Sequence, residues 1–178
     1  MVSLKQIEKQ IENFVPKMKD DVFAVEVIKE AIKSAKEGNF GVGAILVDKK
    51  GKIIYRGHNQ VFSAGRSDFH SEMDVMNKLE TEHNRGAKRK KLIESSKIYT
   101  SLESCPMCWC RMVTAGIMEV YHIADDDFGG IVNIKNQLPY GWKELAYGRV
   151  FTKAECSREL SSIAETLFLL TKDLNDKL

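Results

Sequence analysis

Apolar residues recur at helical spacing in two long segments near the two ends of the chain. Within residues 20–37 they stand at Val22, Val25, Ile28, Ala31, Ile32 and Ala35. Within residues 157–175 they stand at Leu160, Ile163, Ala164, Leu167, Phe168 and Leu174. This spacing predicts an amphipathic helix in each segment, the first ended by Gly38. A shorter helix is expected over residues 3–13, with a capping box at its start.

Short apolar runs rich in β-branched residues predict strands in the middle of the chain. The runs 42–48 and 52–57 flank a tight polar turn, which is typical of a β-hairpin. Two further runs, 97–102 and 118–124, flank a segment that predicts a helix over 106–116. A strand–helix–strand order favours parallel strands with helices packed on the sheet, so we expect an α/β fold.

Three other segments have weaker patterns. Residues 69–82 carry an apolar stripe that predicts another helix. The run NRGAKRKK at 84–91 holds five positive charges; we expect a solvated loop, with a phosphate-contacting loop as the alternative. The aromatic-rich region 125–150 favours a short helix followed by a fifth, edge strand.

Length and composition describe an ordinary globular protein. The 178 residues suit one domain, with 43% hydrophobic and 29% charged residues. A net charge of +2 does not by itself indicate nucleic-acid binding. The N-terminus lacks the apolar core of a secretory signal, and no run approaches the ~20 apolar residues that span a bilayer. We therefore expect a cytoplasmic protein without membrane partners, in which clustered cysteines serve as metal ligands or catalysts.

A C-x-x-C pair lies at the start of the helix predicted over 106–116. Pro106 favours the first helical turn and keeps Cys105 out of the α region, so Cys105 is expected at the N-cap with Cys108 one turn later. Both sulfurs then face one point, and the helix N-terminus favours thiolates. Cys110 points roughly 200° away from Cys108 and is assigned to packing. A redox pair or half of a structural zinc site are the other interpretations of such a pair.

His70 is the best remaining metal ligand, because it also stands at a predicted helix start. Together with Cys105 and Cys108 it would bind one zinc ion per chain and leave a fourth position for water, which is typical of a catalytic zinc. Glu72 is two residues further on, near the metal without binding it. A carboxylate there is placed to move the protons of the water.

The pattern H-x-E followed by C-x-x-C is the signature of zinc deaminases. The sequence resembles the cytidine-deaminase-like superfamily, nearest to its branch of guanine deaminases, cytosine deaminases and tRNA adenosine deaminases. The segments that carry the resemblance are GVGAILVD (41–48), RGHN (56–59), FHSEM (69–73), YTSLESCPMC (99–108) and MEVYHIA (118–124). Ser104 and Gly41 depart from the family, which usually has Pro at both places, and Ser71 stands where Ala is commoner. The hydroxyl of Ser104 is expected to cap the helix in place of the proline ring.

The resemblance implies a three-layer α/β/α fold with a mixed five-stranded sheet. It implies one deaminase domain over 1–178, with a motif core at about 20–125 and a segment 126–178 that covers the pocket or forms oligomer contacts. The aromatic segment Tyr140–Phe151 is expected either to stack on the substrate or to belong to the core or a subunit contact. A homodimer or higher homo-oligomer is implied as well.

The implied reaction is hydrolytic deamination, in which an exocyclic amine of a nucleobase, nucleoside or related small heterocycle becomes a carbonyl and ammonia is released. The resemblance assigns the acid–base role to Glu72 and substrate binding to Asn59 and to groups near Ser71.

Two functions other than deamination of a small molecule are also considered. The first is a tRNA-specific adenosine deaminase that converts adenosine to inosine. The second is a non-catalytic module with a zinc-stabilised deaminase fold, which the intact Glu72 disfavours. The predicted C-terminal helix is apolar and of mixed charge, and the one basic cluster, 85–91, lies in an expected loop, so the sequence favours the small substrate.

Overall fold

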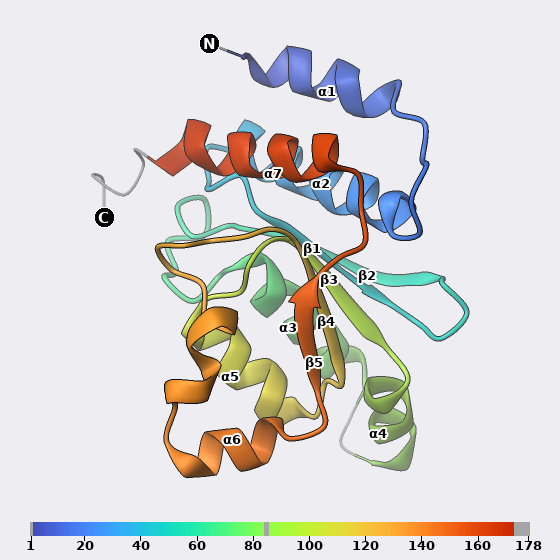
Figure 1. The fold of residues 1–178 in the computed structure, drawn as a ribbon, viewed down its shortest axis with the longest axis vertical. Helices are drawn as coiled ribbons and strands as arrows, with labels where there is room; N and C mark the ends of the chain where they lie inside the picture. Colours follow the sequence, from blue (N-terminus) through green and yellow to red (C-terminus); the bar gives the residue numbers. More distant parts are fainter. Residues whose placement is uncertain (1, 84–85, 173–178) are drawn as a thin grey trace.

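A mixed five-stranded sheet lies at the centre of the computed structural model, which describes residues 2–83 and 86–172 (Figure 1). Its strands are β1 (Gly43–Val47), β2 (Ile53–His58), β3 (Lys97–Leu102), β4 (Glu119–Ala124) and β5 (Val150–Lys153), in the order β2-β1-β3-β4-β5. Strand β1 is antiparallel to both β2 and β3, whereas β3, β4 and β5 are parallel. This confirms the predicted fold class and the predicted edge strand.

Helices cover both faces of the sheet (Figure 1). On one face α2 (Asp21–Lys36) and α7 (Arg158–Thr171) pack side by side, and α1 (Leu4–Glu12) packs on α2. Their apolar faces join the sheet in one core, with Ile28 and Leu160 fully buried. In α2 the prediction holds for Ile28, Ala31 and Ile32, whereas Val22 is exposed and Ala24 and Val27 are buried in addition.

The opposite face carries α3 (Ser71–Glu82), α4 (Ala87–Glu94), α5 (Pro106–Ala115) and α6 (Tyr140–Ala146), with a short 3-10 helix at Val132–Gln137. The second core lies here around the buried Trp109, which contacts the rings of Trp142 and Phe151. None of the helices in the described part of the chain is both long and apolar enough to span a membrane.

The prediction of a loop over 84–91 is wrong for the described residues of this run, because residues 87–94 form α4. Lysine and arginine are good helix formers, and the buried Ile93 fixes the helix on the core. Arg89 pairs with Glu80 of α3, which also ties the helix down. The other elements differ from prediction mainly at their ends; Leu174, expected in the last helix, lies outside the described residues.

The topology brings α3 and α5 together at their N-termini. Strands β2 and β3 are both antiparallel to β1, so they run in the same direction and end at the same edge of the sheet. Helix α3 follows β2 after a loop, and α5 follows β3 after a shorter one. The first turns of both helices therefore meet at this edge.

Candidate active site

Three metal-ligand side chains meet where α3 and α5 begin. His70 and Cys105 are the N-cap residues of these helices, both with extended backbone, and Pro106 occupies the first helical position of α5. The Cys105 Sγ lies 3.6 Å from the His70 Nδ1. Ligand atoms of His70, Cys105 and Cys108 all lie within 4.8 Å of one another, while Cys110 is outside the group. The structure thus brings together the residues that the sequence predicts as ligands.

The geometry of these side chains fits a tetrahedral zinc ion. Bonds of about 2.3 Å to sulfur and about 2.0–2.1 Å to nitrogen at a tetrahedral angle place the two atoms about 3.6 Å apart, the separation seen between Cys105 and His70. Two sulfurs and one imidazole nitrogen are also a donor set that zinc prefers.

The pKa values of the three ligand side chains are shifted in different directions. A hydrogen bond with Cys108 and another with His70 lower the pKa of the Cys105 thiol to about 4. The same hydrogen bond with Cys105, together with burial, raises the pKa of Cys108 well above its ordinary value. The hydrogen bond with Cys105 raises the pKa of His70. A divalent cation would take the place of the protons on Cys108 and His70, as metal binding to such ligands does in general.

Glu72 lies beside these ligands in the first turn of α3 and is 4% exposed. Its Oε2 accepts a hydrogen bond of 2.9 Å from the Ser71 hydroxyl, and the N-terminus of the helix favours its negative charge. Ser71 is fully buried, and its hydroxyl faces Glu72. The hydroxyl therefore orients the carboxylate, while substrate contact by groups near Ser71 stays a prediction.

A cavity of about 330 Å³ opens over this cluster and is lined by both Glu72 and Asn59. The Oδ1 of Asn59 accepts a hydrogen bond from the Val61 amide, and its Nδ2 makes no hydrogen bond with any described residue. That nitrogen is available to a ligand. The apolar walls consist of Phe40, Val42, Val61, Leu102, Phe128 and Phe168.

The C-terminal helix α7 supplies one wall of this cavity through Phe168, whose ring lies 6.3 Å from that of Phe40. The Gly41 amide donates to the Thr171 hydroxyl at 2.8 Å, and a Cβ on Gly41 would lie 2.7 Å from the carbonyl oxygen of Leu167. A proline ring does not fit here and has no amide hydrogen. The departure from the family at Gly41 therefore permits α7 to close over the cavity.

The aromatic segment Tyr140–Phe151 does not line the cavity, so the stacking role considered for it is wrong. Trp142 and Phe151 pack against Trp109 on the far side of α5, whereas Tyr140 and Tyr147 are exposed. The parallel pairing of β5 with β4 carries this segment away from the site. The hydroxyl of Ser104 is also not a cap: it is buried without a hydrogen-bond partner in the described structure.

Glu103 is a site residue that the sequence analysis missed. It follows β3 directly, is 4% exposed and lines the cavity. Its carboxylate accepts hydrogen bonds from the Val132 amide at 2.7 Å and the Asp126 amide at 3.3 Å. Glu103 therefore shapes the loop 125–132, which contributes Asp126 and Phe128 to the cavity wall. The available sequence signal was an acidic residue between the predicted strand 97–102 and the ligand Cys105.

We expect Gly130→Ala to distort this loop. The added Cβ would lie 2.4 Å from the carboxyl carbon of Glu103, and overpacking of this kind typically costs about 1–3 kcal/mol. Substrate KM should rise several-fold while the zinc content stays unchanged. Gly141→Ala is the matched control, because its Cβ meets nothing within 4 Å. Equal kinetics in the two variants would contradict the role given to the loop.

Comparison with known proteins agrees with this geometry. The family described as "Cytidine and deoxycytidylate deaminase zinc-binding region" matches residues 18–124. The tRNA-specific adenosine deaminase of Bacillus subtilis (strain 168) is 37% identical over 111 residues, 62% of this chain and 65% of that protein. The enzyme of the same name from Aquifex aeolicus (strain VF5) is 32% identical over 126 residues, 68% of this chain and 77% of that one. The match to the B. subtilis relative thus spans just under two thirds of its length.

Two solved structures share the fold. A structure from a study of A-to-I editing by tRNA:A34 deaminases superposes with a TM-score of 0.65 at 21% identity, covering 82% of this chain and 98% of that one. A guanine deaminase from Nitrosomonas europaea superposes with a TM-score of 0.57 at 16% identity, covering 90% of this chain and 91% of that one. At such identities these likenesses support the fold alone.

Proposed function

The chain belongs to the cytidine and deoxycytidylate deaminase zinc-binding family, and we propose that it is a zinc-dependent hydrolytic deaminase of a nucleobase ring. This family membership confirms the resemblance seen in the sequence. The observation that carries the proposal is the placement of the buried Glu72 beside the His70–Cys105–Cys108 group, at one cavity. A site that only stabilised the fold would have no use for a carboxylate there.

His70, Cys105 and Cys108 would hold one zinc ion, which lowers the pKa of bound water toward neutrality and so supplies the nucleophile. Glu72 accepts a proton from the attacking water and donates a proton to the ring nitrogen next to the amine-bearing carbon. It then accepts the remaining proton of the added hydroxyl group and transfers it to the amine. A C–O bond forms, the C–N bond breaks, and ammonia leaves. Asn59, with its free Nδ2, holds the edge of the ring.

For the substrate we favour a single flat heterocycle, either a free base or a nucleoside. The cavity of about 330 Å³ is at the lower end of ligand-pocket sizes. Helix α7 and the loop 125–132 cover the cavity, so a single heterocyclic ring would be enclosed between its apolar walls. Phe168 and Phe40 would contact its faces.

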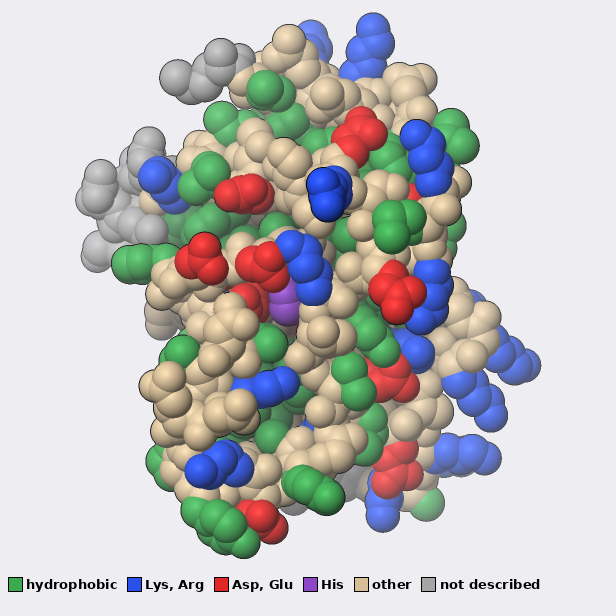
Figure 2. Space-filling view, viewed as in Figure 1, with side chains coloured by type: hydrophobic (Ala, Val, Ile, Leu, Met, Phe, Trp, Pro, Cys, Tyr) green, Lys and Arg blue, Asp and Glu red, His purple; other side chains and the backbone are tan. Residues whose placement is uncertain are grey.

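Adenosine within tRNA is the second candidate, because relatives at 32–37% identity are named tRNA-specific adenosine deaminases. A polynucleotide needs positive surface around the cavity. On the face seen in Figure 2, Lys and Arg are interspersed with Asp and Glu over most of the area. The cavity itself is lined by Glu72, Glu103 and Asp126 and by no Lys or Arg of the described residues, which favours the small substrate.

We also propose a homodimer or higher homo-oligomer in the cytoplasm. Exposed apolar side chains occur on α5, in the 3-10 helix, on α6 and directly after it, at Met107, Ile134, Leu145 and Tyr147. These residues would suit a contact with a second copy. All four cysteines are free, as expected in a reducing compartment.

Salt dependence separates the two substrate classes. The zinc-loaded protein is offered bases, nucleosides, nucleotides and a tRNA anticodon stem-loop, and ammonia is measured. Turnover of a small neutral substrate should change little between about 50 and 200 mM salt, whereas binding through six or more phosphates should weaken by about 10³-fold or more. If the stem-loop is deaminated in preference to the small compounds, and the reaction falls steeply with salt, adenosine within tRNA replaces the small heterocycle as the substrate.

A further inference from the structure

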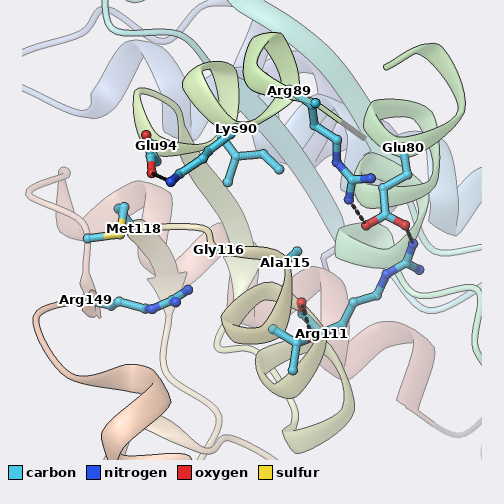
Figure 3. A pocket seen from close by; sticks show the side chains of 12 residues that line it. Glu80, Arg89, Lys90, Glu94, Arg111, Ala115, Gly116, Met118 and Arg149 are labelled. Atoms are coloured by element: carbon cyan, nitrogen blue, oxygen red, sulfur yellow. Dashed lines mark hydrogen bonds and ion pairs between the residues drawn. The ribbon is translucent and has the colours of Figure 1, made fainter. Parts of the chain in front are cut away.

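A second cavity, of about 640 Å³, lies at the opposite ends of the two zinc-site helices (Figure 3). Glu80 stands near the C-terminus of α3, Arg111 and Gly116 mark the last turns of α5, and Arg89 and Lys90 project from α4. Glu80 lies ten residues after His70, about 15 Å along the helix, whereas Arg111 is three residues after Cys108 and its Nη1 contacts the Met73 Sδ at 3.7 Å. We call this second cavity the basic cavity.

Two guanidinium groups in the basic cavity share a single carboxylate. Arg89 Nη2 lies 2.5 Å from Glu80 Oε1, and Arg111 Nη2 lies 3.0 Å from Glu80 Oε2. The Arg89 and Arg111 side chains are only 15% and 24% exposed. The two guanidinium groups therefore share one ion-paired carboxylate, and Asp68 is a further acid close enough to interact with the charge of Arg111.

Arg149 enters the same cavity from the turn before β5. Its Nη1 donates to the carbonyl oxygens of Val113 at 2.6 Å and Ile117 at 3.1 Å. No carboxylate of the described residues lies within ion-pair distance of it, and burial lowers its pKa. Two carbonyl groups at a helix end offset only about half a charge, so Arg149 remains largely uncompensated.

The remaining charges do not balance this excess. Lys90 and Glu94 form an exposed pair at 3.7 Å, which contributes little. The lining as a whole holds four basic side chains, Arg89, Lys90, Arg111 and Arg149, against Glu80 and Glu94. In Figure 3 these basic groups come from three different segments and border one space. Glu80, Arg89 and Arg111 together tie α3, α4 and α5 to one another, so the surplus that a structural role does not explain is Lys90 and Arg149.

We propose that the basic cavity binds a phosphate group. Guanidinium groups match phosphate oxygens in a two-pronged geometry, and partly desolvated cations gain most from such an anion. This gives a role to the basic run of the sequence, whose Arg89 and Lys90 are placed on the cavity side of α4. The phosphate belongs either to the backbone of an RNA or to a free nucleotide. The basic cavity shares no lining residue with the cavity over the zinc ligands, so a phosphate bound there contributes to affinity and not to the chemical step.

The test compares two double variants of α4 in the zinc-loaded protein. Arg89→Gln with Lys90→Gln removes two charges that line the cavity, and Lys88→Gln with Lys91→Gln removes two exposed charges of the same helix that do not. Calorimetric titration uses inorganic phosphate, pyrophosphate, a nucleoside triphosphate and an anticodon stem-loop RNA. The Kd of the bound phosphate compound should rise by about tenfold or more in the first variant and stay near wild type in the second.

Comparison of the titrated compounds also identifies the source of the phosphate. Tight binding of RNA with a salt slope reduced by about one per lost contact assigns it to a nucleic acid, and tight binding of the triphosphate assigns it to a free nucleotide. The single variants Lys90→Gln and Lys91→Gln repeat the comparison at exposed positions if the first double variant unfolds. Equal effects in both variants, or no phosphate binding by the wild type, would overturn the proposal. A change in oligomer mass without phosphate binding would assign the cavity to a contact between copies instead, and would also overturn it.

Discussion

Replacing Glu72 with Gln should remove nearly all turnover and leave the zinc content and the fold unchanged. Glutamine keeps the size of the side chain and can still accept the hydrogen bond from Ser71, but it does not take up a proton. A general acid–base residue typically contributes about 10²–10⁴-fold to the rate, and this one acts in more than one step. The loss should appear in kcat, measured as ammonia release under substrate saturation.

Glu82→Gln is the control for this change. It makes the same chemical change on the same helix, at the exposed C-terminal end where the carboxylate accepts a hydrogen bond from the Tyr55 hydroxyl. Its kcat should equal that of the wild type. Near-normal turnover in Glu72→Gln would mean that another group moves the protons, and loss of zinc in that variant would mean that Glu72 is a ligand.

Cys108→Ser should lose the metal, whereas Cys110→Ser should retain about one zinc per chain. The Cys108 sulfur is fully buried within the ligand group, and the nearby Cys110 is partly buried and outside it. A serine hydroxyl is a much poorer zinc ligand than a thiolate, and with two protein ligands left the ion should dissociate on dialysis. Metal analysis of the two purified variants is the measurement.

A second readout supports the ligand assignment. Zinc that binds only the folded state stabilises it, and more so the tighter it binds, so a chelator should lower the Tm of the wild type and of Cys110→Ser. The Tm of Cys108→Ser should not respond. Zinc retained in Cys108→Ser and lost in Cys110→Ser would contradict the assignment.

The metal ligands could be predicted because their signals are local. Pro106 fixes the start of α5, and the residue before it must be extended, so the positions of Cys105 and Cys108 follow from a few residues. His70 required the further step of recognising a second helix start. The β-hairpin and the amphipathic helices α2 and α7 follow from apolar spacing in the same way.

The cavity walls could not be predicted because they depend on packing between distant segments. Phe40 and Phe168 meet only because the end of α7 lies against the segment before β1, and the close approach at Gly41 has no sequence signature. Helix α4 was not predicted because its residues are mostly polar. It is held in place by the buried Ile93 and by the ion pair between Arg89 and Glu80 of α3. The basic cavity combines α4, α5 and Arg149, which only the folded chain brings together.

The central claim is that the chain hydrolyses an exocyclic amine at the site of Glu72 and the three ligands. The most direct test follows the substrate panel in oxygen-18 water with the zinc-loaded protein. The account predicts that one compound releases ammonia while its ring takes up one labelled oxygen per ammonia, and that Glu72→Gln does neither. Fully zinc-loaded protein that releases no ammonia from any base, nucleoside, nucleotide or stem-loop would contradict it.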